Sequence, residues 1–319
     1  MPDLKNGSRI GGTDLLMVMT VLFWGINMSV IKIGLRELPP HGFNAIRLTL
    51  ASLVYLAVYA VGRRKFALAP GDGWKAVGLG ILGITGYQLF FIEAISRTNA
   101  STASVIMATS PIFIALLSTA LGQERISWAG WLGIVISFAG FFLVVAGNQA
   151  GHALSWSGMR GAAFLILANL CWAAYTVFSK PVLGRNSPFG LAALGTAAGT
   201  ALYLPFGVRD VASISWHRIS WAGWGAILYS GLIAIFLCFI IWYDSVQKVG
   251  SAKTGVYSNL TPIVAVAFAA LFLGERFTAA EAAGSAVVLA GVYLARSGYR
   301  FFERRPAAEN SFDISRPNS

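Results

Sequence analysis

The sequence predicts an all-α integral membrane protein with ten transmembrane helices, arranged as two inverted five-helix repeats. Three observations support this fold class: an apolar composition, ten apolar segments of spanning length, and motifs that recur between the two halves. The 319 residues are 56% hydrophobic and 12% charged, with a mean hydropathy of +0.66. A soluble domain would be about 25% charged. The low charge therefore indicates that most of the surface faces lipid.

Ten segments contain the roughly 20 mostly apolar residues that a membrane-spanning helix needs. Most connections between them are short, so consecutive helices are expected to be antiparallel neighbours. The segments are 13–34, 40–62, 73–95, 99–121, 127–147, 157–180, 187–207, 222–244, 250–273 and 278–296.

Lysines and arginines set the expected orientation, because cytoplasmic loops carry an excess of them. With the N-terminus in the cytoplasm, sixteen of the 24 basic residues fall on the cytoplasmic side and seven on the outer side, with Arg47 inside the second segment. Both termini are therefore expected in the cytoplasm and the protein in the inner (plasma) membrane. Basic loops beside membrane lipids explain the net charge of +11, so no nucleic acid partner is expected.

Motifs recur between the two halves at a nearly constant offset. Trp24 and Lys32 in FWGINMSVIK return 148 residues later as Trp172 and Lys180 in CWAAYTVFSK. Further along, TSPIFIALLSTALGQER (109–125) aligns with LTPIVAVAFAALFLGER (260–276) at an offset of 151. A three-residue insertion between spans would explain the change of offset.

Each repeat has five helices, and five is odd, so the halves are expected to enter the membrane in opposite directions. The repeats are assigned to 13–147 and 157–296, followed by a cytoplasmic tail at 297–319. Inverted repeats are typical of alternating-access carriers, which bind substrate near the midplane where the repeats meet.

The same motifs carry a family resemblance that covers about residues 13–296. They are the WG-N motif ending in IKIGL (24–35), the LPP-to-Arg stretch (38–47), and a repeated element of Pro, G-E-R and glycine-spaced helix, which reads GQER in the first half. The chain resembles EamA-type members of the drug/metabolite transporter superfamily. The resemblance implies ten transmembrane helices and export or exchange of small metabolites, often amino acids. The superfamily also contains nucleotide-sugar and sugar-phosphate carriers.

Amphipathic side chains inside apolar spans are candidates for the substrate-binding site. Asn27 shares a helix face with Trp24, and an amide in hydrocarbon is costly unless it is hydrogen-bonded or faces water. The binding hypothesis is a central cavity with an aromatic floor and a few amides or hydroxyls; the alternative is packing and hydrogen bonding between helices. The candidates are Trp24, Asn27, Tyr87, Gln88, Asn169, Trp172, Tyr175, Tyr257 and Asn259.

Pro111 and Pro262 fall near the middles of the fourth and ninth segments. Each proline removes one helical hydrogen bond, so the carbonyls of Met107 and Ser258 need other partners. A kink there suits a bending gate, and a purely structural kink is an equal alternative.

Arg47 lies inside the second segment, and its repeat counterpart is Gly195. It is interpreted as reaching the outer interface, bonding carbonyls of a neighbouring helix, or contacting substrate. Glu93 and Asp244 are repeat counterparts near span ends, and no histidine falls at a span centre. Obligatory proton coupling through a buried acid is therefore not expected.

Gly133, Gly140, Gly284 and Gly291 give the fifth and tenth segments a small-residue face. Packing within the bundle is one interpretation and a homodimer contact is the other.

Other classes of function fit the sequence less well. No HExxH motif, central aspartate pair or cluster of metal ligands occurs, so no catalytic residue, metal or cofactor is expected. The predicted function is a secondary transporter for a small neutral or zwitterionic metabolite, most plausibly an amino acid, working by alternating access and by export. The alternatives are an exchanger of phosphorylated or nucleotide-linked sugars, and a passive channel.

Overall fold

The computed structural model describes residues 12–61, 68–98, 100–123, 127–149, 156–258, 261–268, 271–272 and 279–300. These residues contain helices and no strand. The main helical elements are α1 (Gly12–Gly34), α2 (Pro40–Val61), α3 (Gly73–Gly80), η1 (Ile81–Gly86), α4 (Tyr87–Arg97), α5 (Ala100–Met107), α6 (Ser110–Ala120), α7 (Trp128–Gln149), α8 (Trp156–Leu183), α9 (Pro188–Ser213), α10 (Trp221–Leu228), η3 (Tyr229–Leu237), α11 (Cys238–Val249), α12 (Ser251–Tyr257), α13 (Thr261–Phe268) and α14 (Ala279–Arg300); a short 3₁₀ turn, η2 (Trp216–Arg218), precedes α10.

Within the described residues, six helices are long and apolar enough to cross a membrane, and a helix satisfies its own backbone groups there. They are Gly12–Gly34, Pro40–Val61, Gly73–Arg97, Met159–Leu183, Pro188–Ser213 and Trp221–Val249. Shorter apolar helices lie at Ser110–Ala120, Trp128–Ser137 and Ala282–Gly291. The protein is thus an all-helical, multi-pass membrane protein, and the number of ten spans stays a prediction.

The fourth expected span is broken rather than kinked. Its helix ends at Met107, and a new helix, α6, begins at Ser110 with Pro111 in its first turn. Proline is favoured in a first turn, because its missing N–H would have no helical partner there. In the ninth expected span, α12 ends at Tyr257 and α13 begins at Thr261, with Pro262 as its second residue; residues 259–260 lie outside the described part of the chain.

The third and eighth spans each contain a π-helical segment, η1 and η3. Helix α3 and helix α10 begin 148 residues apart, whereas α4 and α11 begin 151 residues apart. The difference arises because η1 has six residues and η3 has nine. The prediction of an insertion between spans was therefore wrong: the three extra residues lie inside the eighth span, where a wider helical turn accommodates them.

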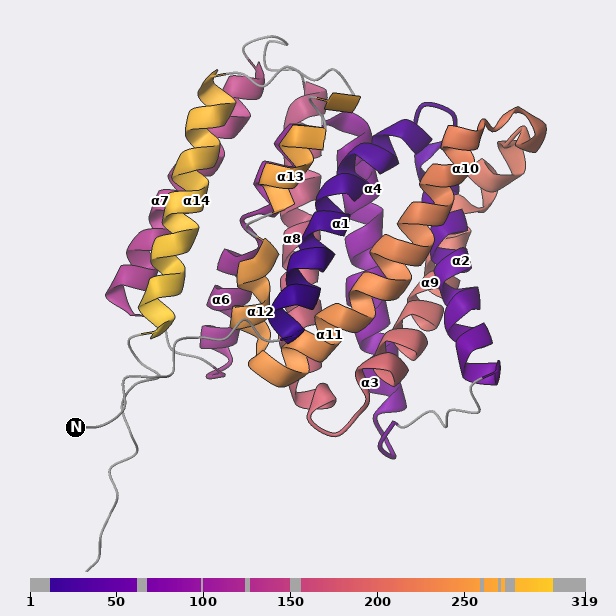
Figure 1. Ribbon diagram of the computed structural model, residues 1–319, viewed down its shortest axis with the longest axis horizontal. Helices are drawn as coiled ribbons and strands as arrows, with labels where there is room; N and C mark the ends of the chain where they lie inside the picture. Colours follow the sequence, from indigo (N-terminus) through magenta and orange to yellow (C-terminus); the bar gives the residue numbers. More distant parts are fainter. Residues whose placement is uncertain are drawn as a thin grey trace, which may run out of the picture.

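The third and eighth spans run in opposite directions, as an inverted repeat requires. Figure 1 shows α3 at the lower edge leading up to α4, and α10 at the upper edge leading down to α11. We call these two sides the α3 edge and the α10 edge. Helix α1 ends towards the α10 edge, and helix α8 ends at the α3 edge, where Arg185 bonds Asp72.

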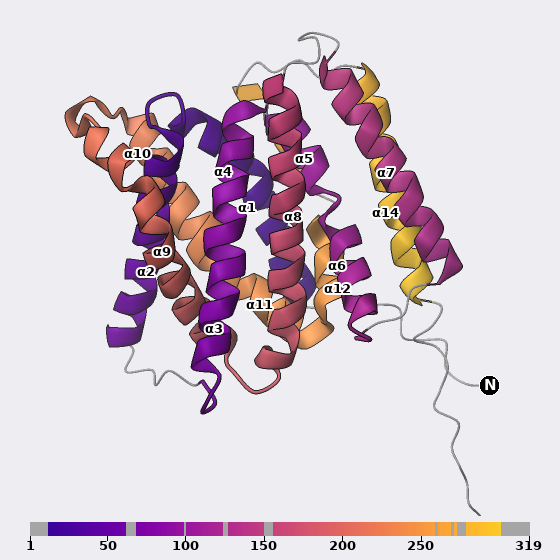
Figure 2. The same cartoon turned by 180° about the vertical axis from the view of Figure 1, so that it is seen from behind.

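Helices α7 and α14 form a close pair at one end of the molecule, side by side in both Figure 1 and Figure 2. Their glycines meet: a Cβ on Gly140 would lie 2.5 Å from the Val288 nitrogen, and one on Gly291 would lie 2.5 Å from the Ser137 nitrogen. Ser137 Oγ also donates a hydrogen bond to the Val288 carbonyl, at 3.2 Å. The small-residue faces of these helices are therefore used within the chain, as the packing interpretation predicted.

Candidate substrate-binding site

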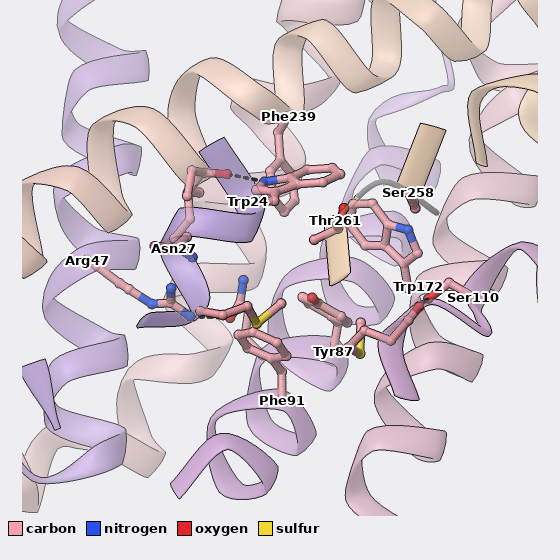
Figure 3. A pocket seen from close by; sticks show the side chains of 15 residues that line it. Trp24, Asn27, Arg47, Tyr87, Phe91, Ser110, Trp172, Phe239, Ser258 and Thr261 are labelled. Atoms are coloured by element: carbon pink, nitrogen blue, oxygen red, sulfur yellow. Dashed lines mark hydrogen bonds between the residues drawn. The ribbon is translucent and has the colours of Figure 1, made fainter. Parts of the chain in front are cut away.

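A pocket lies between the two halves of the chain, and about 620 Å³ in and around it, open solvent included, is not filled by protein atoms. Figure 3 shows side chains from α1, α2 and α4 facing residues from α8, α11 and the start of α13. The lining residues are Trp24, Asn27, Met28, Arg47, Tyr87, Gln88, Phe91, Met107, Ser110, Trp172, Ala234, Ile235, Phe239, Ser258 and Thr261.

One side of the pocket is an aromatic wall built around Trp172. Its ring centroid lies 5.6 Å from those of Trp24 and Phe239 and 5.2 Å from that of Tyr87. The fully buried Trp242 packs behind, 5.0 Å from Trp172 and 5.3 Å from Trp24. Trp24 Nε1 donates to the Ala234 carbonyl at 2.9 Å, which fixes its ring. This wall offers an apolar surface to a bound solute.

The other side of the pocket is polar and comes from the first repeat. Arg47 is 1% exposed; its Nε donates to Asn44 Oδ1 at 2.6 Å and its Nη2 donates to Gln88 Oε1 at 2.7 Å. Asn27 Oδ1 accepts a hydrogen bond from Ser230 Oγ at 2.7 Å. Arg47 thus extends into the pocket rather than to the outer interface, which sequence alone left open.

Asn169, a predicted site residue, lies at the break of the fourth span and does not line the pocket. Its Nδ2 donates to the Ile106 carbonyl and to Thr109 Oγ1, each at 3.0 Å, and its Oδ1 accepts from Ser110 Oγ at 2.5 Å. Ser110 Oγ also reaches the Met107 carbonyl at 2.6 Å. The carbonyls left free at the break therefore obtain the partners that the sequence required.

The remaining predicted site residues are placed in different ways. Trp24, Asn27, Tyr87, Gln88 and Trp172 line the pocket. Tyr175 is buried behind Trp172, with ring centroids 5.3 Å apart. Tyr257 hydrogen-bonds Asp14. Asn259 and the side chain of Pro262 lie outside the described residues.

Sequence reasoning missed the apolar lining residues, among them Phe91, Ala234, Ile235 and Phe239. An apolar residue in an apolar span carries no local signal. Phe239 was nevertheless findable, because it stands 151 residues after Gln88, at the repeat-equivalent position.

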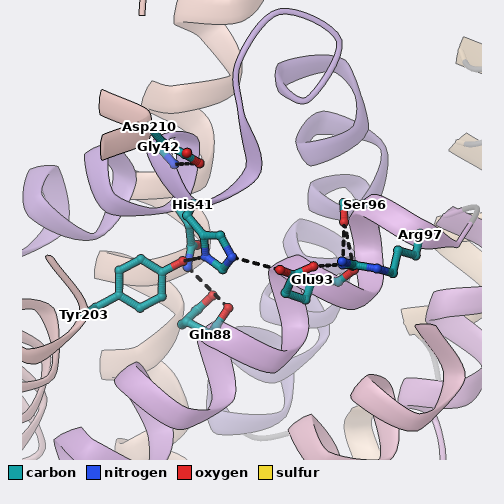
Figure 4. Close-up of polar contacts among 9 residues, drawn as sticks. His41, Gly42, Gln88, Glu93, Ser96, Arg97, Tyr203 and Asp210 are labelled. Atoms are coloured by element: carbon teal, nitrogen blue, oxygen red, sulfur yellow. Dashed lines mark hydrogen bonds and ion pairs between the residues drawn. The ribbon is translucent and has the colours of Figure 1, made fainter. Parts of the chain in front are cut away.

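A cluster of polar side chains lies beside the pocket towards the α10 edge; we call it the His41 cluster, comprising His41, Glu93, Arg97 and Tyr203 (Figure 4). His41 Nδ1 is 2.9 Å from Tyr203 Oη, and its Nε2 is 3.0 Å from Glu93 Oε1. Arg97 forms an ion pair with Glu93. His41 precedes Arg47 by six residues, or about 9 Å along the helix. The cluster therefore joins α2, α4 and α9 on one side of the pocket.

Each membrane edge carries an equivalent junction between the repeats. At the α3 edge, Asp72, before the first residue of α3, accepts hydrogen bonds from Arg185 at 2.6 Å and Asn186 at 2.7 Å. At the α10 edge, Ser220, before α10, donates to Glu37 at 2.6 Å. The members of the two junctions stand 148 residues apart, Glu37 with Arg185 and Asp72 with Ser220.

Hydrogen bonds shift the pKa values of both junction carboxylates. Lys75, Asn186 and Arg185 hold the pKa of Asp72 well below its ordinary value. Ser220 lowers the pKa of Glu37 through its hydroxyl and its backbone N–H. Both carboxylates are thus ionised at neutral pH.

Among the residues that the structure describes, no group of three or more His, Cys, Asp or Glu side chains could hold a metal ion. Cys171 and Cys238 are free thiols.

A multi-pass helical protein with a pocket between its two halves has the architecture of a membrane transporter. The family model described as EamA-like transporter family matches residues 12–146 and 159–297, once for each repeat. The chain belongs to this family. It is accordingly a transporter of the drug/metabolite transporter superfamily and not an enzyme.

Curated relatives cover nearly the same length as this chain. An "Uncharacterized transporter" of Archaeoglobus fulgidus is 27% identical, over 88% of this chain and 97% of its own. A "Probable amino-acid metabolite efflux pump" of Salmonella typhimurium is 25% identical, over 89% and 95%. A "Probable terminal-alkyne amino-acid exporter" of Streptantibioticus cattleyicolor is 28% identical, over 87% and 91%.

The fold also resembles a solved crystal structure. The TM-score is 0.69 at 21% sequence identity, over 90% of this chain and 98% of the other. At this identity the likeness concerns the fold alone.

Proposed function

We propose that the protein exports a small zwitterionic metabolite, an amino acid or a related compound, across the inner membrane by alternating access. The observation that carries the proposal is the pocket between the repeats, with an aromatic wall on one side and Arg47, Gln88 and Asn27 on the other. A solute with one apolar end and one polar end matches these two sides. The names of the relatives from Salmonella typhimurium and Streptantibioticus cattleyicolor support amino acids and export.

The proposal includes the architecture and orientation expected from the sequence. Two five-helix repeats, 13–147 and 157–296, rock about the pocket and expose it alternately to each side. The α3 edge, with Lys75, Arg185 and Lys248, faces the cytoplasm, together with both termini and the tail 297–319. The α10 edge faces outwards.

Two other functions fit the pocket less well. A phosphorylated or nucleotide-linked sugar carries two or more negative charges and calls for several converging basic residues. Arg47 is the only basic residue among the described lining residues. A passive channel needs a continuous path, whereas the His41 cluster joins three helices between the pocket and the α10 edge.

The test is counterflow in proteoliposomes that contain the purified protein. Vesicles loaded with an unlabelled mixture of amino acids should take up a labelled amino acid faster than empty vesicles, and the uptake should saturate. Protein-free liposomes control for leakage. Uptake that rises linearly with the external concentration and does not depend on the solute inside the vesicles would indicate a channel. Exchange of sugar phosphates without exchange of any amino acid would overturn the substrate class.

A further inference from the structure

Three polar side chains of the pocket, Arg47, Gln88 and Asn27, are partly engaged by hydrogen bonds within the protein. Arg47 has five N–H donors and no acceptor, so the Gln88 atom that it meets must be the amide oxygen. The NH₂ group of Gln88 takes no part in this bond. Asn27 Oδ1 accepts from Ser230 Oγ, and the NH₂ group of Asn27 takes no part in that bond. What the three side chains mainly offer to a ligand is therefore N–H donors.

These donors belong to buried residues that line the pocket, and no hydrogen bond to a described residue satisfies them. Arg47, Gln88 and Asn27 are 1%, 3% and 6% exposed, and all three line the pocket. The bonds of Arg47 to Asn44 and Gln88 use its Nε and Nη2 atoms. Its Nη1 group makes no hydrogen bond to a described residue. Figure 3 shows the guanidinium directed into the pocket below Asn27.

The positive charge of Arg47 also lacks a carboxylate. No Asp or Glu occurs among the described lining residues. Glu93, in the neighbouring His41 cluster, is already bound to Arg97 and His41. A buried arginine inside a membrane protein normally pairs with an anion, because an isolated charge in a low-dielectric medium is costly. The pocket is therefore a site with donors and a charge for one anionic group.

We propose that Arg47, with Gln88 and Asn27, binds the carboxylate of the substrate, and that the substrate is an apolar α-amino acid. This inference rests on the proposed function and names its substrate class. One guanidinium matches one carboxylate, and guanidinium–carboxylate pairs are strong because two parallel hydrogen bonds form. The aromatic wall around Trp172 then covers the apolar side chain.

The second repeat has no arginine equivalent to Arg47, which indicates that the substrate binds in a single orientation. The counterpart of Arg47 is Gly195, which packs against α3, where a Cβ would lie 3.5 Å from the Ala76 carbonyl oxygen. Glycine has no side chain and so offers no equivalent donor. The carboxylate site therefore exists once, in the first repeat.

The experiment compares L-leucine with L-leucinamide, which differ only at the carboxylate. Counterflow and tryptophan-fluorescence titration are carried out near pH 6.5, below the usual α-amino pKa of about 7.7–8.0, so that both probes carry the ammonium group. Wild type should prefer leucine at least about tenfold. In Arg47→Gln the preference should fall to about one, through loss of affinity for leucine rather than gain for leucinamide.

Matched variants separate binding from folding. Arg97→Gln removes an arginine that pairs with Glu93 outside the pocket, and it should keep the preference for leucine. Arg47→Lys should restore part of the preference. If Arg47→Gln does not fold, Asn27→Asp is the second variant: its carboxylate should repel that of leucine and so lower the preference for leucine over leucinamide.

The outcomes are distinguishable. Exchange of leucine and leucinamide at equal affinity by wild type, or a preference that survives in Arg47→Gln, would overturn the role of Arg47 and leave the transporter proposal intact. If Asn27→Asp lowers both probes equally, the carboxylate site is likewise wrong. If wild type exchanges neither leucine, phenylalanine nor their amides, the proposed function fails and this inference fails with it.

Discussion

The first repeat presents hydrogen-bonding side chains to the pocket region at three positions where the second repeat has an aromatic ring or no side chain. The equivalent pairs, first repeat first, are Asn27 and Tyr175, Arg47 and Gly195, and Gln88 and Phe239. Only the tryptophans are the same, Trp24 and Trp172, and they touch edge to face. The two repeats thus contribute different side chains to the pocket region at equivalent positions.

The scaffold around the site is much more symmetric than the site. The starts of α6 and α13, the π-helical segments in the third and eighth expected spans, and the junctions at both edges occur at equivalent positions. Alternating access needs two similar gates, but one substrate needs only one set of donors. Under the proposed function, the symmetry would therefore serve the motion and the asymmetry would serve recognition of the substrate.

The largest effect is expected from a test of the opposite directions of the repeats. Trp74, at the start of α3, is 72% exposed, and Trp221, at the start of α10, is 90% exposed. In a background without Cys171 and Cys238, a cysteine replacing Trp74 should react with an impermeant maleimide only from the cytoplasm. A cysteine replacing Trp221 should react only from outside.

Labelling of both positions from the same side would contradict the inverted arrangement, since the two repeats would then be parallel. The reverse pattern would keep the inversion and overturn the orientation.

The next largest effect concerns the aromatic half of the site. Trp172→Ala should lower transport at least about tenfold, or roughly 1.4 kcal/mol of transition-state stabilisation, because the solute loses its apolar contact. Trp172→Phe should retain more activity, since it keeps an aromatic face. Initial rates are compared at equal expression and melting temperature. Trp131→Ala, on α7 and 43% exposed, is the control.

If Trp172→Ala transports with wild-type rate and affinity, the aromatic wall does not take part in substrate binding. A variant that only melts earlier would show instead that Trp172 packs the core, with Trp242 behind it.

Much of the scaffold was predictable because its signals are local. Apolar runs located the six helices of spanning length, and Pro40 and Pro188 begin α2 and α9, as proline in a first turn should. The repeat offset located equivalent positions without any structure. Five of the predicted site residues also line the pocket, since tryptophan, tyrosine and amides stand out in an apolar run.

The rest depended on contacts between distant segments. Pro111 predicted a kink, but a full break forms, because Asn169 from α8 supplies donors to the Ile106 carbonyl and Thr109. The same contact explains why Asn169 does not line the pocket. Arg47 could be assigned to the pocket only once Gln88 and Asn44 were seen to hold it there.

A smaller effect should distinguish the two edge junctions. Asp72 is fully buried and bonds Lys75, Arg185 and Asn186, whereas Glu37 bonds only Ser220 within the described residues. Asp72→Asn should lower the melting temperature in detergent by a few degrees at neutral pH. Glu37→Gln should change it less, because exposed polar pairs contribute little.

The pH dependence follows from the lowered pKa of Asp72. A carboxylate whose folded pKa is depressed stabilises the protein above its unfolded pKa, about 3.9, and that contribution is lost as pH falls through the folded value. The difference between wild type and Asp72→Asn should therefore be constant from neutral pH down to about pH 5 and shrink only below about pH 4. A difference that disappears already between about pH 7 and pH 6 would contradict this assignment.

The smallest effects are expected at Glu93 and Asp244, which are repeat counterparts outside the pocket lining. Glu93 joins α4 to α2 through His41, while Asp244 pairs with Lys248 one turn along its own helix, at 2.7 Å. Partly exposed pairs are usually worth less than 1 kcal/mol. Glu93→Gln should therefore change the transport rate by no more than about threefold, and Asp244→Asn by less.

Both variants should keep the wild-type dependence of transport on pH, because an amide at either position still accepts a hydrogen bond and neither acid contacts the substrate. The measurement is counterflow and pH-gradient-driven uptake for each variant, with folding checked by size-exclusion chromatography. Loss of gradient-driven uptake in Glu93→Gln alone, with counterflow intact, would show that protons pass through the His41 cluster. The first repeat, which contains Arg47, would then also couple transport to the proton gradient, and this would be a further difference between the two repeats.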